Sequence, residues 1–357
     1  SILSRILLSV NPGAVQAHFL DNIFARRSER GFIVDARTYC LPGGESCYEV
    51  LYDALGYIPE CIIRLQQGCG SKPLLIVDRK RGEKMKLYWV RTPESAQNIA
   101  EITSLLETKG VPIPKVYKQI GPYLLSQWIE GHPLRKELPC RYAKTMARYQ
   151  AHIHGAHVDF PADSSQYLQK IIHLFQKKKT VLLSGMNTAE VDSLCSMLQE
   201  EAPASLSKGI RHPDIRTYNL VRNKDGYIYS IDNENLHNGM GFEYDIFKSA
   251  YFTFRKTPWH ISPYLAECAC YIPHNAILKG WNFWNMLFYI NRFLFEMEEK
   301  GGKDAERYKK TLQEVVSLRK RRGSKEGILF HKSFYDATIL HIHKKTQATE
   351  GGRSWSR

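Results

Sequence analysis

The sequence lacks long hydrophobic runs, paired metal-binding cysteines and internal repeats. No stretch of about 18 or more apolar residues occurs, so we expect no membrane-spanning helix. The eight cysteines form no C-x-x-C pair, and Cys268 and Cys270 are too close in sequence for an ordinary zinc knuckle. Reduced thiols in a cytoplasmic protein are therefore expected. The first ten residues hold one arginine and an apolar stretch too short for a signal peptide.

The composition does provide enough apolar material for a large core. The chain has 357 residues, of which 43% are hydrophobic and 11% aromatic. This balance argues against bulk disorder, and the length suits two ordinary domains or one large bilobal domain.

The net charge of +14 is concentrated at the C-terminal end. Residues 319–357 contain ten Lys/Arg against three Asp/Glu, a net of +7. Such a balance favours anionic partners such as nucleotides, phosphosugars and acidic lipids, while no nucleic-acid motif accompanies it. We expect the tail to dock on an anionic membrane or glycolipid, which would make the protein peripheral at the membrane. The alternatives are a solubilising tail and, for Arg319–Arg322, a solvated helix end.

Alternating apolar patterns predict a small β-rich region before a larger helical one. The expected strands are Cys61–Leu65, Leu74–Val77, Met85–Arg91 and Tyr123–Trp128, and a helix is expected over Glu94–Lys109. Helical periodicity then dominates, apart from a strand-rich stretch over His212–Asp232. The predicted division is an N-terminal extension (1–60), an N-lobe (61–127), a C-lobe (128–318) and a basic tail (319–357).

The segment from His212 to Glu234 carries the most informative pattern. A polar loop is followed by Leu220-Val221, a Lys-Asp-Gly turn, an apolar strand and a second acidic cluster. A hairpin of this kind brings both acidic groups to one end. Phosphoryl transfer needs one carboxylate to orient the attacking hydroxyl and an Asn with a second carboxylate to hold magnesium.

This segment resembles the aminoglycoside phosphotransferase and choline kinase-like superfamily. The resemblance rests on His212-x-Asp214-x-x-x-x-Asn219, with Ile231-Asp232-x-Glu234 following it. It implies that Asp214 is the catalytic base and that His212 braces the loop. It also implies that Asn219 and Asp232 bind Mg²⁺, with Glu234 as a second metal or substrate contact.

The resemblance implies an α+β, bilobal protein kinase-like fold that uses ATP and Mg²⁺. The small β-rich N-lobe has one helix, and the larger C-lobe is mainly helical. Ser126, Gln127 and Trp128 resemble the hinge strand that meets the adenine, and Asp245 is expected to give structural support.

The residues expected to bind the nucleotide phosphates depart from the family pattern. Where the family has a lysine after the third strand, this chain has Arg91, whose expected partner on the following helix is Glu101, or Glu94 if the helix begins earlier. The alternative is that Lys86 or Lys84 serves instead. Gly68 and Gly70 form only a weak phosphate-loop candidate. These departures leave a degenerate, nucleotide-binding pseudokinase or interaction module as the alternative to an active phosphotransferase.

The acceptor has to be inferred from charge. Aminoglycosides and choline are cations, whereas Arg211, Arg216 and Arg222 flank the predicted catalytic loop. This contrast favours a hydroxyl of a small molecule or sugar, in particular an anionic or lipid-linked sugar, with Arg216 as a substrate contact. Trp281 and Trp284 could stack on it, although their near-helical spacing is also typical of core residues.

Overall fold

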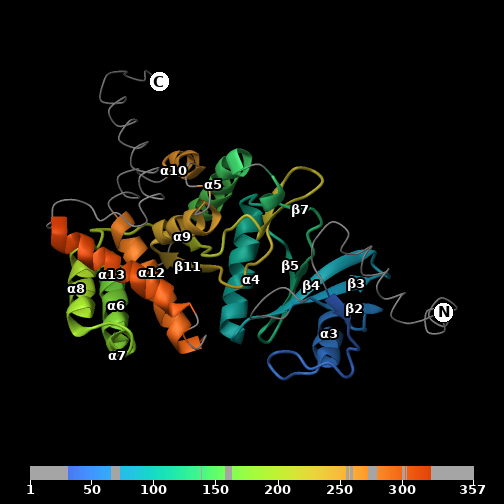
Figure 1. Cartoon of the computed structure of the whole chain (residues 1–357). Coiled ribbons are helices and arrows are strands. Elements are labelled where there is room, and N and C mark those ends of the chain that lie inside the picture. The colour runs from blue at the N-terminus through green and yellow to red at the C-terminus, as the bar shows by residue number, and fades with distance from the viewer. Residues whose placement is uncertain are drawn as a thin grey trace, which may run out of the picture. The chain divides into compact units, whose positions relative to one another are not determined.

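The chain divides into two compact units, which are described separately (Figure 1). Unit 1 comprises residues 1–137 and 217–237, and unit 2 comprises residues 138–216 and 238–357. The computed structural model describes residues 31–65, 73–137, 139–156, 163–254, 257, 260–271, 280–299, 302 and 304–322. The division differs from the expected lobes because the strand-rich stretch after Arg216 belongs to unit 1.

Unit 1 contains a six-stranded sheet in which all neighbouring strands are antiparallel. The strand order is β1-β2-β3-β4-β6-β5. The bounds are Gly31–Ile33 (β1), Cys61–Leu65 (β2), Leu74–Asp78 (β3), Glu83–Trp89 (β4), Val116–Ile120 (β5) and Tyr123–Gln127 (β6). The apolar runs that predicted strands are buried here, including Ile62, Ile76, Leu87 and Leu125.

Residues 31–60 form part of this sheet unit, which differs from the extension expected over 1–60. β1 pairs with β2, and helix α3 (Cys47–Leu55) buries Cys47 and Leu51 in the same cluster as Leu125. The apolar face of α3 therefore packs on the core of the sheet, so residues 31–60 are not a separate extension. Residues 1–30 lie outside the described part of the chain.

Helix α4 (Pro93–Thr108) confirms the helix predicted after the β4 strand. Its N-terminus is capped by Thr92, whose hydroxyl accepts a hydrogen bond from the Ser95 amide at 3.2 Å, and Pro93 occupies the first turn. Apolar residues at helical spacing, Ile99, Ile102 and Leu106 among them, form its buried face.

A hairpin of β9 and β10 completes unit 1. Its bounds are Leu220–Arg222 (β9) and Ile228–Ser230 (β10), and β9 also pairs with β7 (His132–Pro133), which the 3₁₀ turn η1 (Leu134–Lys136) follows. Gly226 turns the hairpin with a φ of 89°, which side chains rarely adopt. A Cβ atom on Gly131 would lie 2.1 Å from the carbonyl oxygen of Arg222, so glycine lets β7 approach β9.

Unit 2 is mainly helical. Its helices are α5 (Pro139–Gly155), α6 (Ser164–Lys177), α7 (Lys179–Leu183), α8 (Thr188–Glu200), α9 (Phe242–Phe254), α10 (Ile261–Cys268), α12 (Trp281–Glu299) and α13 (Ala305–Arg322), with short strands β8 (Lys208–Arg211) and β11 (His237–Met240) paired. Aromatic contacts fill the core between α9 and α12, for example Tyr251 against Phe288 with ring centroids 4.6 Å apart.

The C-terminal end of the described chain is helical. Arg319–Arg322 forms the last turn of α13, and residues 323–357 lie outside the described part. The docking predicted for the basic tail therefore stays a prediction. Within the described residues, none of the helices is both long and apolar enough to span a membrane.

Candidate active site

The predicted catalytic loop lies between β8 and β9. The chain leaves unit 2 at Arg216 and enters unit 1 at Thr217. Ile215 and Leu220 are completely buried and anchor the loop, while Asp214, Arg216 and Asn219 stay partly exposed. Asp214 therefore belongs to the cluster of unit 2, whereas Asn219 and Asp232 belong to the cluster of unit 1.

In unit 1 the hairpin register brings Asn219 and Asp232 together. Leu220 pairs with Ser230, and one residue further the Ile231 amide donates to the Asn219 carbonyl oxygen at 2.9 Å. The next side chain, Asp232, accepts a hydrogen bond from Asn219, with Nδ2 to Oδ2 at 3.3 Å. The structure thus joins the two residues that the resemblance assigns to the metal.

Lys86 is the cation beside this pair. It extends from β4, and its Nζ donates to the carbonyl oxygen of Ile231 at 2.9 Å. The same Nζ lies 4.8 Å from the ring centroid of Tyr88, which points to the same face because it is two residues along the strand. Lys86 itself is half-buried.

The expected Arg91–Glu101 pair is wrong. β4 ends at Trp89, so Arg91 lies exposed beyond the strand. Glu101 is also exposed and accepts a hydrogen bond from Gln97, and no ion pair joins it to Arg91. Of the two alternative lysines, Lys84 forms a surface ion pair with Glu130, and Lys86 donates to the carbonyl oxygen of Ile231, next to Asp232.

The pKa of Tyr88 is affected by negative charge in the same region. Burial raises the pKa of its phenol, and the charges of Glu234 and Asp232 raise it further. The charge of Glu234 therefore acts on the same region as that of Asp232, and its role as a metal or substrate contact stays a prediction. The phenol remains protonated, so Tyr88 can donate but does not add charge.

In unit 2 two cations contact one oxygen of Asp214. The Oδ1 atom lies 2.7 Å from Nη2 of Arg216 and 3.1 Å from Nζ of Lys248. Burial raises the pKa of the Asp214 carboxyl, but the charges of Lys248 and Arg216 outweigh it and leave the pKa below its usual value. Asp214 is therefore anionic at neutral pH.

Helix α9 holds this arrangement in place. Lys248 and Phe252 are four residues apart, so they share one face of the helix. Lys248 reaches Asp214, and the Arg216 guanidinium lies 4.0 Å above the centroid of the Phe252 ring. Sequence reasoning missed Lys248, because a lysine on a predicted helix gives no sign of which loop its face contacts.

The other two arginines near the loop do not contact Asp214. Arg211 is buried and pairs with Asp245, which supports the structural role expected for that carboxylate. Arg222 pairs with Glu137 through two hydrogen bonds, of 2.7 and 3.1 Å. Of the three arginines expected to favour an anionic acceptor, only Arg216 is thus placed beside the predicted base.

His212 is completely buried in unit 2. The position fits a residue that braces the loop, which stays a prediction.

The predicted hinge residues are part of the sheet of unit 1. Ser126 is buried and its hydroxyl donates to the Lys86 carbonyl oxygen at 3.4 Å. The Gln127 amide donates to the Lys115 carbonyl oxygen at 2.8 Å, and the Trp128 amide donates to that of Lys84 at 3.2 Å. Their contact with adenine stays a prediction, and Gly68 and Gly70 lie outside the described residues.

Trp284 is a core residue, so the prediction that it stacks on a substrate is wrong. Its side chain is 2% exposed and packs edge-on against Phe283, with ring centroids 4.8 Å apart. The helical spacing that offered both interpretations therefore reflects a buried face of α12. The side chain of Trp281 lies outside the described part of the structure.

The Asn219–Asp232 pair fits a magnesium ion that arrives with its nucleotide. Among the residues described, no group of three or more His, Cys, Asp and Glu side chains is placed to hold a metal ion. Magnesium is commonly bound by one or two carboxylates together with substrate phosphates, and it prefers oxygen ligands. One carboxylate and one amide at a strand end are such a partial set.

Solved structures of other proteins share the fold of this chain. The choline kinase LicA from Streptococcus pneumoniae is similar with a TM-score of 0.54 and 13% identity, over 85% of this chain and 97% of that one. A putative fructosamine-3-kinase from Haemophilus somnus gives a TM-score of 0.53 and 15% identity, over 76% and 95%. A third similar structure is a thermostable mutant of aminoglycoside phosphotransferase APH(4)-Ia in a ternary complex with ADP and hygromycin B. Its TM-score is 0.55 and its sequence identity is 13%, over 78% of this chain and 99% of that one.

At these identities the likeness establishes the kinase-like fold, and a sequence comparison with curated proteins gives no match. The sequence itself supplies the family. Residues 82–258 match the family model of the phosphotransferase enzyme family, a segment that contains Lys86 and every residue from Asp214 to Lys248. Through this segment the chain matches the phosphotransferase enzyme family, and the protein is a kinase with a hydroxyl acceptor.

Proposed function

We propose that this kinase transfers the γ-phosphate of MgATP to a hydroxyl of an anionic or lipid-linked sugar. The hydroxyl oxygen attacks the γ-phosphorus, the bond from that phosphorus to the bridging oxygen breaks, and ADP leaves. Asp214 accepts the hydroxyl proton, while Asn219 and Asp232 hold the magnesium. Lys86 replaces Arg91 as the phosphate contact.

The observation that carries this proposal is the Asn219–Asp232 contact at the end of the hairpin, 3.3 Å from Nδ2 to Oδ2. Bound magnesium would neutralise charge on the phosphate oxygens. Lys86 lies at the carbonyl of Ile231, next to Asp232, where its ammonium can add a second positive charge. A lysine in this place answers one of the two departures that led to the degenerate alternative, namely Arg91; the other, the weak glycine loop at Gly68 and Gly70, lies outside the described residues.

The electrostatics of Asp214 suit an orienting base. Because its pKa is lowered, the carboxylate is always available as an acceptor but is a weak base. Phosphoryl transfer proceeds through a loose transition state, in which positioning the hydroxyl matters more than early removal of its proton. An anionic Asp214 can accept a hydrogen bond from that hydroxyl and receive the proton late.

The acceptor class follows from the charges that remain near the base. Arg216 and Lys248 are both within hydrogen-bond distance of Asp214, so a cationic acceptor would meet like charges there. A sugar that carries phosphate or carboxylate would instead be attracted. The net charge of +14 acts in the same direction over longer distances.

The proposal is tested by following γ-³²P from ATP into a panel of sugars and sugar phosphates in the presence of Mg²⁺. We expect transfer by the wild type, and a loss of about 10²- to 10⁴-fold in Asp214→Ala, the range attributed to general bases. Full transfer by Asp214→Ala would contradict the assignment of the base. Absence of any Mg²⁺-dependent thermal shift with ATP or ADP would contradict the function as a whole.

A further inference from the structure

The positive charges on Asp214 exceed its negative charge. Arg216 and Lys248 reach the same carboxylate oxygen, at 2.7 and 3.1 Å. With all three groups ionised, two cations face one anion and one positive charge remains. This excess lies at the atom to which the acceptor hydroxyl must come if the proposed function holds.

The two cations are not equivalent. Arg216 has a fixed orientation, because its planar guanidinium lies on the Phe252 ring while Nη2 contacts Asp214. Lys248 is a point charge on a flexible stem, and among the described residues its polar contact is with Asp214. Its side chain keeps 20% of its surface exposed. Arg216 alone can balance the carboxylate, so Lys248 is able to turn to another anion.

We propose that Lys248 binds a phosphate or carboxylate group of the acceptor and thereby selects anionic acceptors. The inference rests on the proposed function, since it assumes that the acceptor binds at Asp214. Lys248 is then a specificity-determining residue: it adds affinity for one class of acceptor without taking part in the transfer itself. The flexible stem allows its ammonium to follow an anionic group that lies a few atoms from the reacting hydroxyl.

A purely structural role for Lys248 makes a different prediction. If it only neutralises Asp214, its removal changes the binding of charged and neutral acceptors alike. If it binds the acceptor's anion, its removal affects anionic acceptors selectively. The ratio of the affinity for an anionic acceptor to the affinity for a neutral acceptor separates these two cases. This holds even if the absolute affinities or turnover also change.

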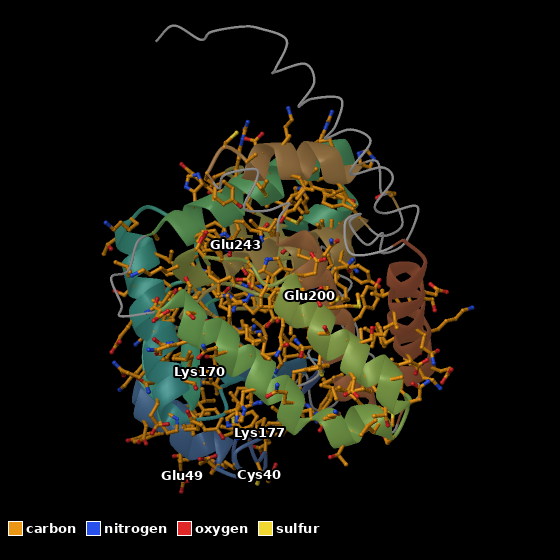
Figure 2. The ribbon with its side chains drawn as sticks, turned by 90° about the vertical axis from the view of Figure 1, so that its left-hand side faces the viewer. Cys40, Glu49, Lys170, Lys177, Glu200 and Glu243 are labelled. Atoms are coloured by element: carbon orange, nitrogen blue, oxygen red, sulfur yellow. The ribbon has the colours of Figure 1, made fainter. Side chains whose placement is uncertain are left out.

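The experiment titrates the full-length protein, saturated with MgADP, with three probes that share one ring: glucose, glucose 6-phosphate and glucuronate. MgADP occupies the nucleotide site, so phosphate binding there does not interfere. Affinities are measured by calorimetry for the wild type, Lys248→Gln and Lys248→Arg. The matched control is Lys170→Gln, which removes the same charge from an exposed position on α6 of the same unit (Figure 2).

We expect the wild type to bind at least one anionic probe more tightly than glucose. Lys248→Gln should lower the affinity for that probe about tenfold, the effect of one hydrogen bond to a charged group. The affinity for glucose should change less than about threefold. Lys248→Arg and Lys170→Gln should keep the preference. The inference is overturned if the wild type has no preference for either anionic probe, or if Lys248→Gln retains it.

Failure of the proposed function gives a different result. In that case MgADP itself does not bind, and the titrations are repeated without nucleotide. The same contrast between wild type and Lys248→Gln then decides the inference on its own. Unfolding midpoints of the four proteins without ligand show whether each variant is folded.

Discussion

The polar clusters of the two units are held in different ways. In unit 1 the backbone sets the geometry: the register of β9 and β10 places Asn219 beside Asp232, and Lys86 donates to a main-chain carbonyl oxygen. In unit 2 side chains set it, because Lys248 and Phe252 of α9 hold Asp214 and Arg216. Substitutions in unit 1 should therefore change ligand binding with little effect on the fold, whereas charge changes in unit 2 affect the partner groups as well.

The largest effect is expected from Asp232→Asn in unit 1. The change is nearly isosteric and leaves the hairpin register intact, but it removes the one carboxylate of the proposed metal pair. Lost charge stabilisation of several kcal/mol corresponds to a fall of about 100-fold or more in phosphate transfer. Transfer from labelled ATP measures it, with circular dichroism as a check of the fold. Transfer within about threefold of wild type would show that Asp232 does not bind the metal.

A second large effect is expected on the stability of unit 2. Arg211→Met leaves Asp245 buried without its cation, and breaking a buried ion pair in this way costs about 3–5 kcal/mol. Arg148→Met is the matched control, because its ion pair with Glu267 is on the surface and should contribute about 0–1 kcal/mol. Urea unfolding of the two variants compares them. An equal decrease in the free energy of unfolding for both variants would mean that the Arg211–Asp245 pair does not stabilise unit 2 as a buried ion pair.

This contrast also explains what the sequence could predict. The spacing of thirteen residues between Asn219 and Asp232 spans a hairpin whose turn and apolar strands are visible in the sequence, so their proximity was predictable. Lys248 was not, because its contact depends on how α9 packs against a loop that is distant in sequence. Arg91 was misjudged because the prediction extended β4 by two residues, and the face of a strand-end side chain depends on where the strand stops.

The pairing of residues 31–33 with the sheet was not predicted from the sequence, for a related reason. β1 is only three residues long, and its pairing with β2 is set by tertiary contacts and not by its own pattern. Trp284 shows a second limit of prediction from sequence. An aromatic stripe at helical spacing has the same sequence pattern whether it lines a pocket or a core.

A moderate effect is expected when Lys86 is replaced. Lys86→Met keeps the length of the stem but removes the ammonium beside Asp232, so we expect kcat/KM for MgATP to fall about 10- to 100-fold. Lys84→Met on the same strand is the control, because Lys84 pairs with Glu130 at the surface. Steady-state kinetics measure both. Comparable losses in the two variants would place the phosphate contact elsewhere.

The smallest effect, taken per pH unit, is expected on the stability of unit 2 as the pH falls. Burial lowers the pKa of His154 to about 4 in the folded state, below the usual value of about 6.5 in an unfolded chain. The unfolded state therefore takes up a proton first as the pH falls, and stability should drop by about 1.4 kcal/mol per pH unit between 6.5 and 4. Unfolding at a series of pH values measures this slope. His154→Gln should reduce it, and an unchanged slope would assign it to other groups.

The most direct test of the account is the Mg²⁺ dependence of ATP binding in two variants. The account assigns nucleotide and metal to the cluster of unit 1 and the hydroxyl to Asp214 of unit 2. ATP affinity is therefore measured with and without Mg²⁺ for the wild type, Asp214→Asn and Asp232→Asn. We predict that Asp214→Asn keeps the wild-type enhancement by Mg²⁺ while losing transfer, and that Asp232→Asn loses the enhancement. An enhancement that is lost in Asp214→Asn and kept in Asp232→Asn would contradict the division of labour between the two clusters.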